Sequence, residues 1–200
     1  MTWAGAIVAY LLGAVPSSYI AGRLRGIDLR RVGSGNLGAT NAYRVLGARW
    51  AVPVLLFDIF KGWAAVSIVA PLFGGTSAGW SIACGACAVL GHTFSPFVGF
   101  RGGKGVATAA GMFLALAPLA LLAGVVTFAV AVASTRTVSI GSLLAALVVP
   151  VAVFLTKGTG AVLWLALATA AFVFFTHRAN IRRLLRGEEH RFEGRKRSQV

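Results

Sequence analysis

The sequence has 200 residues, of which 58% are hydrophobic and only 12% charged, and its formal net charge is +14. A soluble domain carries about a quarter of its residues charged, so this composition excludes a soluble enzyme, a disordered tail and a small secreted protein. It predicts an all-α polytopic membrane protein. The basic residues interrupt apolar runs instead of lining one face, which argues against a nucleic-acid partner.

Apolar runs separated by turn residues predict the membrane spans in chain order. A helix rises about 1.5 Å per residue and the hydrocarbon core is about 30 Å thick, so runs of about 20 residues are long enough to cross. The first run is not a cleaved signal peptide, because its basic residues follow it instead of preceding it. The predicted spans are residues 3–22, 52–73, 80–97, 141–155 and 161–176, with two more inside the uncharged stretch 106–135.

The stretch 106–135 would form about 45 Å of helix, which is too long for one span and too short for two full ones. A turn near Pro118 places the basic carboxyl-terminal region on the same side as the first basic cluster, as the positive-inside rule favours. The prediction is therefore seven spans, with the N-terminus outside and the C-terminus in the cytoplasm. Of the 19 Lys and Arg residues, only Lys157 would then lie outside and Lys61 within a span.

Any chemistry is therefore expected at the cytoplasmic face of the membrane. A single domain over residues 1–200 is expected, with a basic tail from about residue 190 that includes Arg195, Lys196 and Arg197.

The first polar segment, residues 33–44, is rich in glycine and small polar side chains. Its Gly-x-Gly-x-x-Gly pattern matches a dinucleotide fingerprint, but no strand precedes it and Asp58, at the acidic position, lies inside a span. Glycines let backbone N–H groups converge on an anion, and a helix beginning near Ala39 adds its positive end. We expect an anion site here, rather than a flexible interfacial loop, made by Ser34, Gly35, Asn36, Gly38, Thr40, Asn41 and Arg44.

The second polar segment is Gly102-Gly103-Lys104-Gly105, at the start of a predicted helix. It is not a Walker A loop, because Lys104 is followed by glycine instead of Ser or Thr. Backbone N–H groups and one Lys predict a phosphate cradle. The residues alone leave open the alternative that Arg101 and Lys104 are ordinary positive flanks of a span.

The third segment leaves the last span at His177. His177, Asn180 and Arg183 step by three and therefore line one flank of a helix. The alternative is a basic juxtamembrane helix on anionic lipid, which Arg182 and Arg186 fit.

Five further residues lie within or beside spans. An unpaired charge at membrane depth costs about 2.5 to 3.5 kcal/mol on insertion scales, so Asp58 and Lys61 are expected to pair with each other rather than contact substrate. His92 is more often a hydrogen-bonded packing residue than a catalyst. Cys84 and Cys87 are expected to be packing residues.

The three segments together supply several cations and few carboxylates, which is typical of a phosphate-binding site. Paired carboxylates for hydrolysis, a clustered metal site and a Ser-His-Asp set are not recognisable. We therefore expect no cofactor and no metal.

At these residues the chain resembles a known family. Residues 34–41 with Arg44, residues 102–105, and His177-x-x-Asn180-x-x-Arg183 followed by Gly187-x-Glu189 look like the three cytoplasmic motifs of the bacterial acyl-phosphate:glycerol-3-phosphate acyltransferases, the PlsY family. Asp58-x-x-Lys61-Gly62 and Gly91-His92 match its pattern too, and the resemblance covers nearly the whole chain.

The resemblance implies transfer of an acyl group from fatty acyl phosphate to the 1-hydroxyl of sn-glycerol 3-phosphate, giving lysophosphatidate and phosphate. It implies a multi-pass protein of the bacterial inner (plasma) membrane, with a possible hand-off from a soluble acyl-phosphate synthase. Catalytic roles fall to Ser34, Arg44, Lys104, His177 and Asn180. Substrate binding falls to Gly35, Asn36, Gly38, Thr40, Asn41, Gly102, Gly103, Gly105, Arg183 and Glu189, and support to Asp58, Lys61 and His92.

Two alternatives stay open at this point. A transporter of organophosphates would also place phosphate-binding helix ends in a membrane, although the polar residues gather at one face and no inverted repeat is visible. Ser34 has two possible roles, a nucleophile or an orienting ligand, and the second is expected because no Asp stands near to orient His177. The first and third motifs are expected to face one cleft.

Overall fold

The computed structural model describes residues 2–191, and every regular element in that range is a helix. This confirms the predicted all-α class. The chain forms two compact units, residues 1–118 and 119–200. The prediction of one domain over the whole chain stays a prediction, and the basic tail residues Arg195, Lys196 and Arg197 lie outside the described residues.

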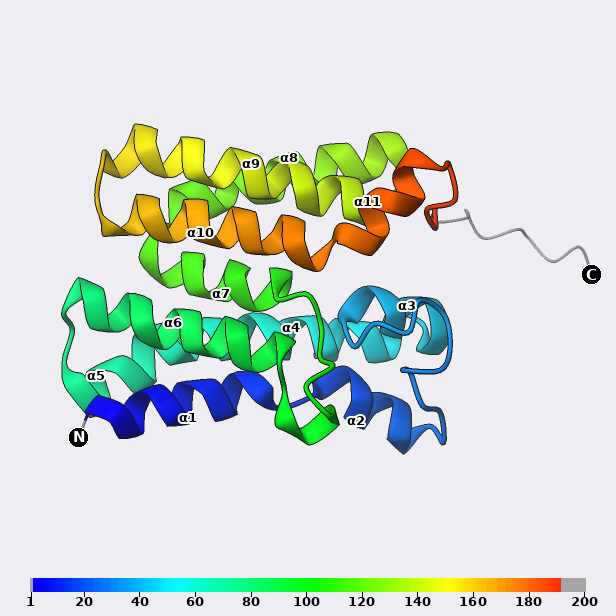
Figure 1. The fold of residues 1–200 in the computed structure, drawn as a ribbon, viewed down its shortest axis with the longest axis horizontal. Helices are drawn as coiled ribbons and strands as arrows, with labels where there is room; N and C mark the ends of the chain where they lie inside the picture. Colours follow the sequence, from blue (N-terminus) through cyan, green and yellow to red (C-terminus); the bar gives the residue numbers. More distant parts are fainter. Residues whose placement is uncertain (1, 192–200) are drawn as a thin grey trace, which may run out of the picture. The chain divides into compact units, whose positions relative to one another are not determined.

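The first unit is built on two helix pairs, α1 beside α6 and α4 beside α7 (Figure 1). Helices α1 and α6 and the segment 65–70 share a core of small side chains, including Ala9, Ala65 and Cys84, which let apolar helices approach closely. Cys84 is fully buried there and Cys87 packs against it, as predicted. The elements are α1 (Thr2–Ala14), α2 (Ser17–Leu24), α3 (Ala39–Leu46), α4 (Ala48–Ala64), η1 (Ala65–Val69), α5 (Ala70–Gly74), α6 (Ala78–Thr93), η2 (Pro96–Val98) and α7 (Val106–Leu116).

Local sequence explains where these helices begin and end. Pro16 interrupts the first span between α1 and α2, because it fixes its own φ and lacks an N–H. Ser77 caps α6 by accepting a hydrogen bond from the N–H of Trp80. A turn of π-helix, η1, joins α4 to α5, so that residues 48–74 form one continuous, mainly apolar helical stretch of spanning length.

The second unit contains α8 (Pro118–Thr135), α9 (Val138–Lys157), α10 (Ala161–Thr176) and α11 (Arg178–Leu185). The antiparallel helices α9 and α10 pack along each other (Figure 1). The chain bends by 59° between α10 and α11. His177 occupies the bend, with φ −95° and ψ 6°, so the third motif begins where the membrane helix ends.

Five helical stretches of the described chain are long and apolar enough to cross a membrane, and the bent pair α10–α11 makes a sixth. The helix does break before Pro118, at Ala117, as predicted. The two halves are unequal, however: α8 is of spanning length, whereas α7 has 11 residues, or about 16 Å of helix. Seven full spans remain a prediction.

Candidate active site

The first motif is a loop that Asn41 holds together. Asn41 lies in the first turn of α3 and is 1% exposed. Its amide oxygen accepts the N–H of Ser34 at 2.8 Å, and its amide nitrogen donates to the carbonyls of Leu29 and Val32 at 3.1 and 3.2 Å. The sequence placed Asn41 among the phosphate ligands. In the structure its side chain instead forms hydrogen bonds within the loop and positions Ser34.

The glycines on both sides of Ser34 make this tight loop possible. Gly33 and Gly35 have φ of +63° and +69°, a region that side chains disfavour. A Cβ at Gly35 would also lie 3.1 Å from the carbonyl oxygen of Arg30. Helix α3 begins at Ala39, where the sequence predicted it, and carries Thr40 and Arg44, both half-buried.

An ion pair braces the segment before this loop. The side chain of Arg30 donates to the carboxylate of Asp28 at 2.7 and 2.9 Å and lies 4.8 Å from the centre of the Tyr19 ring. The Arg30 hydrogen bond lowers the pKa of Asp28 to about 2. Asp28 therefore stays ionised and keeps its pairing with Arg30 throughout the physiological range.

The second motif is folded back onto the end of α6. The N–H of Gly102 donates to the carbonyl of Thr93 at 2.9 Å, and the N–H of Gly103 donates to that of His92 at 3.1 Å. After them the chain turns into α7 through Gly105, with Lys104 half-buried between the glycines.

Four backbone N–H groups of the two predicted cradles have partners inside the protein, and the cradles stay a prediction. The N–H groups of Ser34, Gly35, Gly102 and Gly103 all donate to acceptors within the protein, because a loop must satisfy its own backbone groups.

The first two motifs meet inside the first unit. A Cβ on Gly103 would collide with Nε2 of His92 and lie 2.7 Å from the carbonyl oxygen of Leu37. Gly103 therefore lies between His92, whose carbonyl binds the second motif, and Leu37 of the first motif. Sequence reasoning missed this junction because no short-range pattern joins residues 37 and 103.

The two charges in the second span pair with each other, as predicted. Nζ of Lys61 lies 2.8 Å from Oδ1 of Asp58, and both side chains are at most 1% exposed. Oγ of Ser17 donates to the same oxygen at 2.7 Å. Ser17 was missed from sequence, where a serine at a helix start has no distinguishing signal.

In the second unit, His177 is 2% exposed at the bend after α10. Its Nδ1 lies 2.8 Å from the carbonyl oxygen of Val173. A carbonyl accepts, so Nδ1 carries a proton, and a neutral ring then has its lone pair at Nε2.

Glu189 gathers the rest of the third motif. Oε1 accepts from Asn180 at 2.6 Å and from Ser139 at 3.0 Å, while Oε2 accepts from Nε of Arg183 at 2.7 Å. Burial alone would raise the pKa of Glu189, but hydrogen bonds from Asn180, Arg183 and Ser139 outweigh it and leave the pKa below its ordinary value. Asn180 and Arg183 do share one flank of α11, and their partner Ser139 was missed from sequence.

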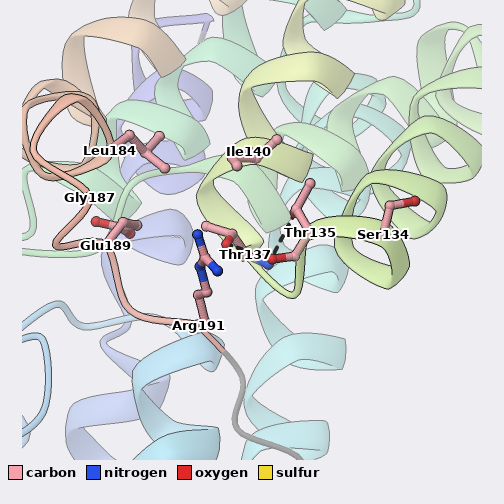
Figure 2. A pocket seen from close by; sticks show the side chains of 8 residues that line it. All are labelled: Ser134, Thr135, Thr137, Ile140, Leu184, Gly187, Glu189 and Arg191. Carbon is pink, nitrogen blue, oxygen red and sulfur yellow. Dashed lines mark hydrogen bonds between the residues drawn. The ribbon is translucent and has the colours of Figure 1, made fainter.

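Glu189 also borders a pocket of about 300 Å³ within the second unit. Figure 2 shows Glu189 and Arg191 on the segment after α11, across from hydroxyl groups of the α8–α9 turn. The lining residues are Ser134, Thr135, Thr137, Ile140, Leu184, Gly187, Glu189 and Arg191.

The predicted site residues thus fall into two groups. The first and second motifs lie together in the first unit and the third lies in the second unit. The prediction that the first and third motifs face one cleft stays a prediction.

Comparison with known proteins agrees with this architecture. The sequence model of the glycerol-3-phosphate acyltransferase family matches residues 3–187. The glycerol-3-phosphate acyltransferase of Geobacter sulfurreducens is 42% identical over 93% of this chain and 95% of its own length. That of Anaeromyxobacter dehalogenans (strain 2CP-C) is 45% identical over 90% and 92%.

Solved structures of PlsY, an integral membrane glycerol 3-phosphate acyltransferase, are similar throughout. Its glycerol 3-phosphate form is 38% identical, with a TM-score of 0.89 over 96% of both chains. Its lysophosphatidic acid form is 36% identical, with a TM-score of 0.87 over 96% of this chain and 95% of the other. These likenesses give the transporter alternative no support. The chain belongs to the glycerol-3-phosphate acyltransferase family, integral membrane enzymes of phospholipid synthesis.

Proposed function

We propose that this acyltransferase uses fatty acyl phosphate as donor and acylates the 1-hydroxyl of sn-glycerol 3-phosphate, giving lysophosphatidate and inorganic phosphate. One observation carries the proposal: the chain matches, over nearly its whole length, a solved enzyme with a glycerol 3-phosphate form and a lysophosphatidic acid form. These two molecules are the acceptor and the product of the proposed reaction. The resemblance of the three motifs to the acyl-phosphate-dependent family supports the donor.

The chemistry asks little of the protein beyond alignment. The hydroxyl oxygen attacks the acyl carbonyl carbon, the bond from that carbon to the phosphate oxygen breaks, and the leaving phosphate takes the hydroxyl proton. Because the donor is already activated, the enzyme has to hold two phosphates, align the hydroxyl and stabilise the oxyanion.

The side chains support a division of roles. Arg44 and Lys104 in the first unit supply positive charge for phosphate, and Ser34, fixed by Asn41, orients a reactant. His177 and Asn180 position glycerol 3-phosphate, and Arg183 adds charge beside them. Glu189 supports this group by holding Asn180 and Arg183.

The orientation in the membrane follows from charge. We propose seven spans with α7 as a short one, the N-terminus outside, and the site at the cytoplasmic face of the bacterial inner membrane. There a soluble acyl-phosphate synthase would supply the donor. A cysteine at Lys157 should react with an impermeant thiol reagent in whole cells, whereas one at Arg31 should be protected; the reverse result would invert the topology.

The reaction is tested with purified protein in detergent. With acyl phosphate and glycerol 3-phosphate, we expect phosphate release and lysophosphatidate in equal amounts, without any sealed vesicle. Acyl-coenzyme A and acyl carrier protein serve as donor controls. Turnover with either control but not with acyl phosphate would refute the proposed donor.

A second measurement tests direct transfer. Radiolabelled acyl phosphate is added without acceptor, and the protein is then denatured and digested. Direct transfer predicts no stable label. Stoichiometric label on Ser34 would instead establish an acyl-enzyme and overturn the orienting role.

The shared cleft is tested by distance. Spin labels on cysteines at Val32 and Ala179, exposed neighbours of Ser34 and His177, should report a separation of less than about 20 Å, roughly two helix diameters. A clearly larger separation in protein with bound glycerol 3-phosphate would refute one common site.

A further inference from the structure

The ring of His92 lies between a buried ion pair and the second motif. His92 lies in the last turn of α6 and is 8% exposed. Its Nδ1 lies 3.1 Å from Nζ of Lys61, which is itself paired with Asp58. The other ring nitrogen, Nε2, lies against Gly103, where a Cβ would collide with it.

The contacts of Lys61 determine which ring nitrogen carries the proton. An ammonium group has three donors and no acceptor. The three N–H donors of Lys61 have three acceptors within hydrogen-bond distance. These are the carbonyl of Val15 at 3.1 Å, Oδ1 of Asp58 at 2.8 Å and Nδ1 of His92 at 3.1 Å. Nδ1 of His92 is 3.6 Å from Asp58, too far for a hydrogen bond. Nδ1 therefore accepts from Lys61, and the proton of the neutral ring lies on Nε2.

The same histidine sets the place of the second motif. Its carbonyl accepts the N–H of Gly103 at 3.1 Å, while its ring packs against the Cα of that glycine. On the other side, the carbonyl of Leu37 in the first motif leaves no room for a side chain. The position of Lys104, the next residue, is thus linked through Gly103 to His92.

We propose that Asp58 and Lys61 are positioning residues that act through His92. They hold its ring in the Nε2-protonated form, and the ring places the Gly102–Lys104 turn against the first motif. The kinetic part of this proposal rests on the proposed role of Lys104 in phosphate binding, whereas the tautomer does not. The buried ion pair would then contribute to substrate affinity as well as to folding.

The tautomer is tested without any activity. In protein labelled with nitrogen-15 histidine, NMR at neutral pH should show His92 with a protonated Nε2 and an unprotonated Nδ1, the signals being assigned by their loss in His92→Gln. Lys61→Met should alter the Nδ1 signal. A protonated Nδ1 in the wild-type protein would overturn the proposal, whatever the assays of donor and product show.

The link to Lys104 is tested by kinetics. His92→Ala should raise the KM for one phosphate substrate about tenfold with little change in kcat. Adding Gly103→Ala should cost less in that background than in the wild type, because contacting residues couple. Trp80→Phe is the matched control. It removes a partly buried hydrogen bond from the indole N–H to the carbonyl of Ala70 in the same unit and should leave both KM values unchanged.

Conservative variants guard against loss of folding. The amide of His92→Gln reaches the position of Nε2 and can keep the contact with Gly103, whereas that of His92→Asn reaches only the position of Nδ1, where it can accept from Lys61. We expect Gln to retain more substrate affinity than Asn. Additive effects of His92→Ala and Gly103→Ala, or unchanged KM values in folded His92→Asn, would refute the positioning role.

Discussion

The first and third motifs are held in place by different physical means. In the first unit, a neutral amide, Asn41, shapes the loop through three hydrogen bonds to backbone groups. In the second unit, one carboxylate, Glu189, collects the side chains of Ser139, Asn180 and Arg183. The comparison teaches that glycine-rich loops at a membrane surface need an internal hydrogen-bond organiser, while an arginine-bearing helix needs a counter-charge. The first arrangement should be insensitive to pH, and the second should not.

The largest effect is expected from removing the neutral organiser. Asn41→Ala leaves the N–H of Ser34 and the carbonyls of Leu29 and Val32 without this partner. The bond to Leu29 is buried, and a buried group left unpaired costs about 1 to 3 kcal/mol. We expect at least about a hundredfold loss of kcat/KM together with a lower Tm in detergent. Wild-type activity in Asn41→Ala would mean that the loop forms without this side chain.

Removing the charge of the other organiser should cost somewhat less. Glu189→Gln keeps an oxygen that can accept from Asn180 but loses the charge opposite Arg183. A hydrogen bond to a charged group contributes about 1.5 to 3 kcal/mol, so kcat/KM should fall roughly ten- to a hundredfold. Glu188→Gln, at the exposed neighbouring position, is the control and should behave like the wild type.

The cations themselves can be compared in the same way. Lys104→Ala removes a charge-assisted bond to substrate phosphate and should lower kcat/KM about tenfold or more, chiefly through KM. Arg101→Ala, three residues earlier and exposed, should change it little. Equal effects of the two substitutions would favour general electrostatic attraction over a specific phosphate contact.

The smallest effect is expected from acid. The pKa of Glu189 in the folded protein lies below the ordinary value of 4.5. Its contribution to stability is therefore complete above that value and is lost as the pH falls through the lowered pKa. The Tm difference between wild type and Glu189→Gln should shrink below about pH 4.5, whereas that between wild type and Asn41→Ala should stay constant. A constant difference for Glu189→Gln would show that its charge is not involved.

Sequence alone determined the class of this protein and its motifs. Uncharged runs of about 20 residues have the length of a helix across lipid, so the spanning helices were predictable. The break before Pro118 was predictable because proline interrupts a helix. The pairing of Asp58 with Lys61 was predictable too, because two charges one helical turn apart at membrane depth stabilise each other. The motif residues also sufficed to indicate the family.

Tertiary structure alone decided what the glycines do. From sequence, their N–H groups were expected to bind anions, but in the fold those of Ser34, Gly35, Gly102 and Gly103 donate to protein acceptors. The partners are Asn41 and the carbonyls of Val32, Thr93 and His92. Contacts such as Gly103 with Leu37, or Glu189 with Ser139, join residues far apart in the chain, so no local pattern encodes them. The physical reason is that a polar group forms hydrogen bonds with whichever partner lies near it in space, and the packing of the helices determines which residues lie near one another.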